Sequence, residues 1–200
     1  MGRHARPHRR AGDGSRWCTY GLMAYTCLMK TITITAGHGG NDPGAVAHGE
    51  NERDLMTWLR DCVAHKVRLT GHDVRTDGAA WQNLPLAHAL LLVPGSDCAI
   101  ELHCNASANQ TATGVEVVAM PRDKARAQRI AKAIADVLGM RLRGDQGWID
   151  QTQTARGRLG FIRAGGMVVE VFFISNKADL ETYQQRKWLV ASAIAQEVVK

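Results

Sequence analysis

The chain has 200 residues, of which 45% are hydrophobic, and this is enough for one compact domain around a single core. Its net charge of +6 is uneven, because residues 1–30 carry six Lys or Arg and one acid, whereas the other 170 residues carry 19 basic and 18 acidic side chains. A nearly neutral body without a basic stripe argues against nucleic acid as a partner.

Composition also argues against two further classes of protein, those that span a membrane and small domains held together by disulfides. No stretch approaches the roughly 18 consecutive apolar residues that a membrane-spanning helix needs, so we expect no stable membrane span. The five cysteines are odd in number and irregular in spacing, unlike the disulfide frameworks of small secreted domains.

Residues 1–29 differ from the rest of the chain. Their Arg, His, Gly and Pro-rich beginning can bury little apolar surface, which predicts a flexible basic extension rather than a folded unit. Met29 directly precedes a strand-like run, and this position suggests that natural translation starts there. We therefore expect one catalytic domain over residues 30–200.

The first half of that domain alternates predicted strands and helices. Asn51 is a candidate N-cap for the longest helix of this half, Pro85 lies near the beginning of the second, and glycines follow the first strand. The predicted elements are a strand at 31–35, a helix at 52–69, a strand at 73–76, a helix at 84–93 and a strand at 98–103.

The second half continues this alternation. Its predicted elements are a strand at 114–120, a helix at 122–138, a loop at 141–166, a strand at 167–174 and a closing helix at 177–200 with Trp188 buried. The pattern predicts an α/β fold with a twisted, mostly parallel mixed sheet of about five or six strands, flanked by helices on both faces. Ligands of such sheets gather at the carboxyl ends of strands.

Two histidines follow predicted strands. His38 lies in a Gly-rich turn after the first strand, and His103 ends the strand at 98–103. If these strands are parallel neighbours, both imidazoles emerge at one edge, where a divalent ion can join them. Glu52, in the first turn of the helix, can supply a carboxylate ligand to the same site, and Glu50 is the rival candidate.

Glu170 interrupts the most apolar predicted strand. A buried carboxylate there needs a metal, a cation or a proton to offset its desolvation, and a general base that works near neutrality needs a raised pKa. The structural alternative is an ion pair with Arg158 or Arg163.

Four motifs in order resemble the zinc-dependent N-acetylmuramoyl-L-alanine amidases of bacterial autolysins and phage endolysins. They are HGGNDPGA at 38–45, ERDL at 52–55, LHCNA at 102–106 and VEVFFISN at 169–176. The resemblance covers about residues 30–198.

This resemblance implies one Zn²⁺ bound by His38, Glu52 and His103, with Glu170 as the catalytic carboxylate. It favours Glu52 over Glu50, because Glu52 has the family's following Asp-Leu. The implied reaction is hydrolysis of the amide bond between N-acetylmuramic acid and L-alanine in peptidoglycan, with water activated at an open zinc position.

The chain departs from the family pattern in two places. Glu101 stands where the family usually has Ser, on the predicted face of His103, and the family's Arg-containing helix is replaced by the apolar run at 83–91. We place Glu101 with Asn105 and Asp42 as candidates to support the ligands or contact the substrate.

Two other functions stay open at this stage. One is a zinc peptidase that cuts the stem peptide, and the other is a non-catalytic wall-binding module whose zinc has Glu101 or Cys104 as a fourth ligand. We expect a monomer that acts in the periplasm or cell wall. A phage or prophage endolysin would be made in the host cytoplasm and released by a partner.

Overall fold

The computed structural model describes residues 28–154 and 159–200. Most of the predicted N-terminal extension lies outside the described residues, and so does Arg158.

A six-stranded mixed sheet forms the centre of the molecule, in the order β4-β1-β5-β8-β6-β7. Its strands are β1 (Thr31–Ala36), β4 (Asp73–Arg75), β5 (Cys98–Asn105), β6 (Glu116–Ala119), β7 (Trp148–Asp150) and β8 (Met167–Phe173). All neighbouring pairs are parallel except β6 and β8. A separate antiparallel pair, β2 (Val46–Ala47) and β3 (Glu50–Asn51), precedes the first helix.

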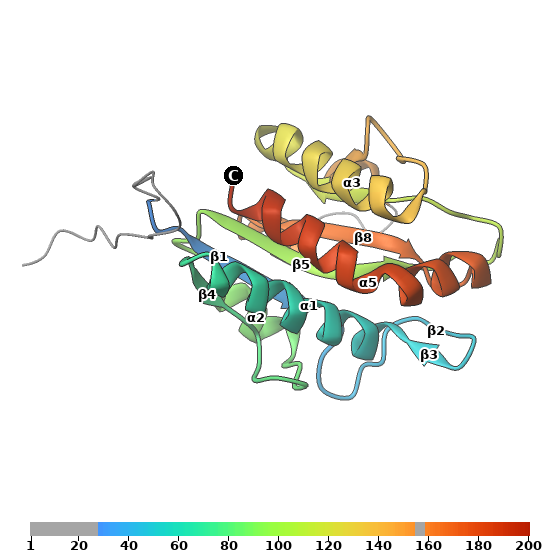
Figure 1. Ribbon diagram of the computed structural model, residues 1–200, viewed down its shortest axis with the longest axis horizontal. Coiled ribbons are helices and arrows are strands. Elements are labelled where there is room, and N and C mark those ends of the chain that lie inside the picture. Colours follow the sequence, from blue (N-terminus) through green and yellow to red (C-terminus); the bar gives the residue numbers. More distant parts are fainter. Residues whose placement is uncertain (1–27, 155–158) are drawn as a thin grey trace, which may run out of the picture.

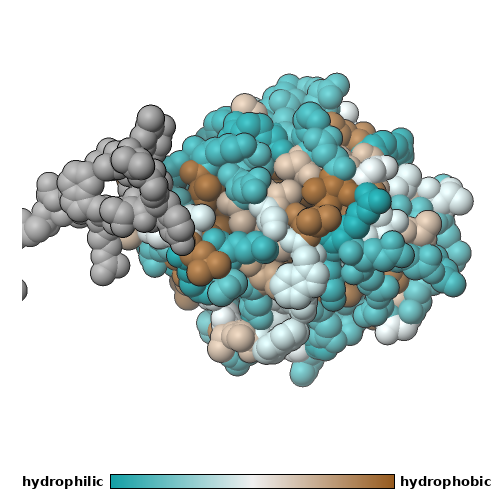
Figure 2. All heavy atoms as spheres, in the orientation of Figure 1, coloured by the Kyte–Doolittle hydropathy of each residue, from teal (hydrophilic) through white to brown (hydrophobic). Residues whose placement is uncertain are grey.

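Helices cover both faces of the sheet, which confirms the predicted architecture. The helices α1 (Glu52–Leu69), α5 (Lys177–Val198) and α3 (Lys124–Leu138) lie side by side over one face (Figure 1). The shorter α2 (Leu86–Leu92) and α4 (Gly160–Arg163) pack on the other. The outer surface of the three-helix layer is mostly hydrophilic, with separate hydrophobic areas (Figure 2). None of the described helices has the length and apolarity to cross a membrane.

Alternation along β5 divides its side chains between the two faces. Ile100 and Leu102 belong to the main core beneath the three long helices, whereas Ala99 contacts the small cluster under α2 and α4. Glu101 and His103 follow on that second face. The strand therefore supplies core packing on one face and polar chemistry on the other.

The beginning of α1 follows from its sequence. The Asn51 side chain accepts a hydrogen bond from the Asp54 backbone amide at 2.9 Å and caps the helix, as predicted. After the helix, Gly71 adopts a positive φ of 85°, which lets the chain turn into β4.

The structure corrects several boundaries. Pro85 is extended, with ψ at 154°, so α2 begins at Leu86 and ends at Leu92. The segment expected to be a loop contains β7, the 3₁₀ turn η2 (Gln151–Gln153) and α4. The 3₁₀ turn η1 (Pro121–Asp123) precedes α3. These elements are too short to produce a periodic pattern, and β7 depends on pairing with β6.

The burial predicted for Trp188 was wrong. Trp188 is 59% exposed, and its ring lies edge to face with that of Trp58, with the ring centroids 4.6 Å apart. The two indoles cover each other at the outer junction of α1 and α5 instead of entering the core.

Candidate metal centre

The turn after β1 holds His38 in an unusual backbone conformation. His38 has a positive φ of 59°, and the Asn83 side-chain amide donates hydrogen bonds to the carbonyls of Ala36, Gly37 and His38 at 3.1, 3.0 and 2.8 Å. A non-glycine residue at positive φ is strained, so the turn needs such support.

Two glycines make room for the cluster. A Cβ atom on Gly37 would lie 2.0 Å from Cε1 of His103, and one on Gly44 would lie 2.7 Å from Oε2 of Glu52. Both contacts are closer than atoms tolerate, so these positions require glycine.

Glu52 lies between the two histidines at the N-terminus of α1. Its Oε1 is 2.9 Å from Nδ1 of His103, and its Oε2 is 3.1 Å from Nε2 of His38. The backbone amides of Cys104 and Ala45 donate to the two oxygens at 3.1 and 3.0 Å and fix the carboxylate. One ligand atom from each of His38, Glu52 and His103 lies within 4.8 Å of the others.

The rival ligands lie elsewhere. Glu50 accepts a hydrogen bond from Gln184 of α5 at 2.8 Å. The Cys104 side chain belongs to the main core, and burial raises the pKa of its thiol well above the usual value. A buried neutral thiol on the opposite face of β5 is not available as a fourth ligand.

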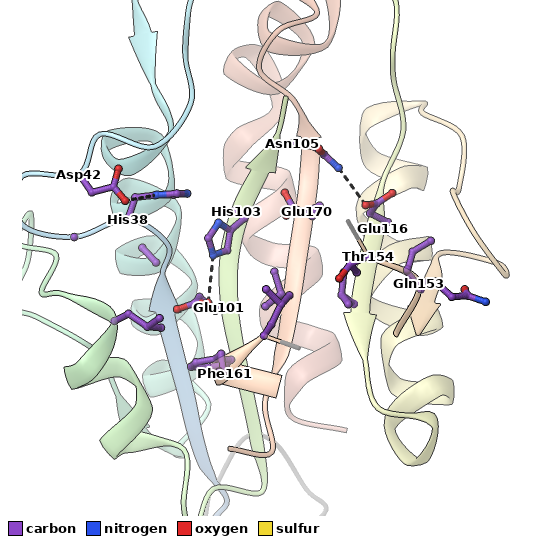
Figure 3. Close-up of a pocket in the computed structure, with 18 of the residues that line it drawn as sticks. His38, Asp42, Glu101, His103, Asn105, Glu116, Gln153, Thr154, Phe161 and Glu170 are labelled. Atoms are coloured by element: carbon purple, nitrogen blue, oxygen red, sulfur yellow. Dashed lines mark hydrogen bonds and ion pairs between the residues drawn. The ribbon is translucent and has the colours of Figure 1, made fainter. Parts of the chain in front are cut away.

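Each histidine contacts a second carboxylate through its other ring nitrogen. Nδ1 of His38 is 2.8 Å from Asp42, and Nε2 of His103 is 3.2 Å from Glu101 (Figure 3). Asp42 is largely exposed, whereas Glu101 and His103 are both buried. The pairing places Nε2 of His38 and Nδ1 of His103 on the side of Glu52.

The carboxylates control protonation of the histidines. Burial alone would lower the pKa of His103, but the hydrogen bonds with Glu101 and Glu52 raise it to about 10. The adjacent Glu52 carboxylate also raises the pKa of His38. Burial would raise the pKa of Glu52, yet contact with both imidazoles lowers it well below its usual value.

Glu170 lies beside His103, since the two residues are partners in the register of β8 and β5. Its side chain points from the strand toward the same pocket (Figure 3). Glu170 is half-buried rather than fully buried, and Arg163, one of the two partners in the structural alternative, is exposed at the end of α4. The apolar strand is thus interrupted where it borders the pocket.

This pocket has a volume of about 720 Å³ and contains more than the predicted residues. Asn105, one of the predicted residues, donates to Glu116 at 3.1 Å, and Glu116 forms an ion pair with Arg143. Sequence patterns missed Glu116 and Arg143, because the first lies in an ordinary strand and the second in a predicted loop. The only signal in the sequence that could have indicated these two residues was a charged side chain within a strand or a loop.

The residues fit a divalent metal. Nε2 of His38 is buried and has Oε2 of Glu52 3.1 Å away, but within the part of the chain that the structure describes it makes no hydrogen bond of good geometry. A buried ring nitrogen of this kind needs a partner, and two imidazole nitrogens with one carboxylate form a donor set typical of catalytic zinc, which keeps an open position.

Comparisons with known proteins agree with this geometry. The family model described as N-acetylmuramoyl-L-alanine amidase matches residues 32–200. A curated Staphylococcus aureus (strain NCTC 8325 / PS 47) relative, assigned as autolysin PH, is 29% identical over 184 residues, which are 83% of this chain and 37% of the relative. The chain therefore spans little more than a third of that relative's length.

Solved structures show the same fold. A Neisseria meningitidis protein assigned as an N-acetylmuramoyl-L-alanine amidase has a TM-score of 0.78 and 43% identity, over 84% of this chain and 93% of that one. The catalytic domain of the amidase CwlV from Bacillus (Paenibacillus) polymyxa var. colistinus has a TM-score of 0.72 and 23% identity, over 85% and 96% of the respective chains. Because the family model matches residues 32–200, which are most of this chain, the chain belongs to the N-acetylmuramoyl-L-alanine amidase family.

Proposed function

We propose that this chain is a zinc-dependent amidase that hydrolyses the bond between N-acetylmuramic acid and L-alanine in bacterial peptidoglycan. The observation that carries the proposal is the convergence of His38, Glu52 and His103 beside Glu170, at one end of a large pocket, in a chain of this family.

In this proposal, His38, Glu52 and His103 hold one Zn²⁺. When bound, zinc supplies a Lewis acid that makes water acidic near neutral pH and stabilises the oxyanion of an attacked carbonyl. The backbone amides of Cys104 and Ala45 keep the Glu52 carboxylate oriented, and the turn fixed by Asn83 keeps His38 in place.

Asp42 and Glu101 orient the two imidazoles. Each accepts a hydrogen bond from the ring nitrogen that faces away from Glu52, which leaves a lone pair on the inner nitrogen for the metal. Carboxylate partners of this kind also raise the basicity of ligating histidines. Glu101, the family departure, thus acts through His103 rather than as a fourth ligand.

Glu170 is the general base and then the general acid. Its carboxylate takes a proton from the attacking water as the water adds to the lactyl carbonyl of the muramic acid. The same carboxyl group then gives the proton to the nitrogen of L-alanine as the amide bond breaks. Its place in register beside His103 puts it next to the ligands without making it one of them.

We propose that the protein acts as a monomer, since His38, Glu52, His103 and Glu170 form the site without a residue from a second copy. We propose that residues 30–200 form the catalytic domain and that it acts in the periplasm or cell wall, where its substrate lies. For an endolysin, a partner protein would release it from the host cytoplasm.

The proposal is tested by digestion of purified peptidoglycan with the zinc-loaded protein, with and without a chelator, followed by mass analysis. We expect free stem peptides with L-alanine at the N-terminus, and loss of this product with chelator. Cuts within the peptide would show a peptidase instead. Binding without any released product would show a wall-binding module.

A further inference from the structure

The pocket continues across the sheet, away from the candidate metal centre. Glu170 of β8 is the register partner of His103 on β5 and of Glu116 on β6. All three residues line the pocket. Since neighbouring strands lie about 4.8 Å apart, Glu116 is roughly 10 Å from His103 along this row. Figure 3 shows the row, with Glu116 on the far side of Glu170 from His103.

Arg143 is fixed at the far end of the row. Its Nε donates to Oε2 of Glu116, whose Oε1 accepts from Asn105 at 3.1 Å, and its guanidinium lies 4.9 Å from the ring centroid of Phe173. Its backbone amide also donates to the Val115 carbonyl at 3.0 Å. Main chain and side chain are both held before any ligand arrives.

The terminal nitrogens of Arg143 are still available. In residues 28–154 and 159–200, neither Nη1 nor Nη2 makes a hydrogen bond or ion pair, and the side chain is 32% exposed. These nitrogens carry four of the five N–H donors of a guanidinium, in the planar arrangement that matches a carboxylate.

The charges of the pocket favour an anion at this position. Arg143 is the only Lys or Arg among the described residues that line the pocket. Four carboxylates also line it, of which Glu116 is paired with Arg143 and Asp42, Glu101 and Glu170 lie elsewhere. A substrate carboxylate would be repelled near Glu101 and attracted at Arg143.

We propose that Arg143 forms a subsite for a carboxylate of the peptide part of the substrate, with Glu116 and Asn105 as its positioning residues. This rests on the proposed function. An extended peptide advances about 3.3 Å per residue, so the anchor lies within about three residues of the amide that is cut. The ligand that we assign to this subsite is the free α-carboxylate of the acidic residue that follows L-alanine, which falls within that reach.

The alternative is that the Glu116–Arg143 ion pair only stabilises the fold. The two roles are separated by two synthetic substrates, N-acetylmuramoyl-L-alanyl-D-glutamate and N-acetylmuramoyl-L-alanyl-D-isoglutamine, each with its γ-carboxyl group blocked as the methylamide. They then differ only in whether the α-carboxylate is free or amidated. Both are assayed with the zinc-loaded wild-type protein and with Arg143→Gln, Arg143→Lys and Arg141→Gln. Arg141 is a matched control, because it lies two residues away and does not line the pocket.

We expect wild-type protein to prefer the free carboxylate by about 10- to 100-fold in kcat/KM, mainly through KM, because a charged bidentate contact is lost with the amide. Arg143→Gln should lose this preference, so that its kcat/KM on the free-carboxylate substrate falls to the value that it has on the amidated one. Arg143→Lys keeps the charge without the planar fork and should retain only part of the preference. Arg141→Gln should behave like wild type.

The subsite is refuted if wild-type protein cuts both substrates equally, or if Arg143→Gln slows both by the same factor. The first result needs no variant and stands even if Arg143→Gln does not fold. Failure of wild-type protein to cut either substrate, together with no release of stem peptides from whole peptidoglycan, would instead refute the amidase function itself.

Discussion

The two faces of the central sheet are built differently, although the same strands supply both. Beneath the three long helices, β5 and β8 present Ile100, Leu102 and Val169, all with no exposed surface. On the opposite face the same strands present Glu101, His103 and Glu170, where the short helices α2 and α4 leave a pocket open. Stability and chemistry are therefore separated by single-residue steps along each strand.

The largest difference between the two faces is expected for substitution of Glu170, which should lower turnover without lowering stability. Glu170→Gln keeps the shape of the side chain but removes the proton acceptor, so kcat should fall roughly 10²- to 10⁴-fold with little change in melting temperature. Turnover of muropeptides and zinc content are measured together.

His38→Ala is the matched comparison, because it removes a proposed ligand and should lose zinc as well as activity. Full lytic activity in Glu170→Gln would show that another group moves the proton.

On the face beneath the three long helices we expect a loss of stability without a loss of turnover. Ile100→Ala removes a fully buried side chain from the main core and should lower the free energy of unfolding by about 2–5 kcal/mol, with kcat of the folded protein unchanged. Urea unfolding and activity at low temperature measure the two quantities.

Leu91→Ala, at a residue that is 78% exposed on α2, should change the free energy of unfolding by less than about 0.5 kcal/mol. Equal losses in the two variants would contradict the assignment of the core.

A smaller effect is expected at Glu101. Glu101→Gln leaves a weaker hydrogen-bond acceptor for Nε2 of His103 and should weaken zinc binding about 10- to 100-fold, as measured by competition with a chromophoric chelator.

Glu101→Asp should recover part of the affinity if its shorter carboxylate still reaches the ring. Unchanged zinc affinity in Glu101→Gln would exclude a positioning role for this residue.

The last prediction concerns pH in the metal-free protein, where no ligand exchange or turnover is involved. The pKa of His103 is raised from 6.5 to about 10, so its stabilising contribution is fully present below pH 6.5 and is lost as the pH rises through about 10. The melting temperature of the metal-free protein should therefore fall over this range, and His103→Asn should lack this component. An identical pH slope in wild type and variant would show that Glu52, Glu101 and Glu170 do not hold a proton on His103.

Local patterns determined much of this protein. Alternating β-branched residues indicated β1, and apolar runs indicated β5 and β8. The cap at Asn51 indicated the beginning of α1, and four motifs indicated the family and the candidate ligands. These features depend on residues close in sequence, where side-chain periodicity and capping act directly.

Only the tertiary structure decided how the site is assembled. Packing directs Glu50 to Gln184 and Glu52 to the two histidines, although the two residues are almost adjacent in sequence. Pairing of β7 with β6, and of Glu116 with Arg143, joins segments about 30 residues apart that no local pattern connects. Such contacts form because distant strands meet in one sheet, and their geometry is set by burial and hydrogen bonding across the fold rather than along the chain.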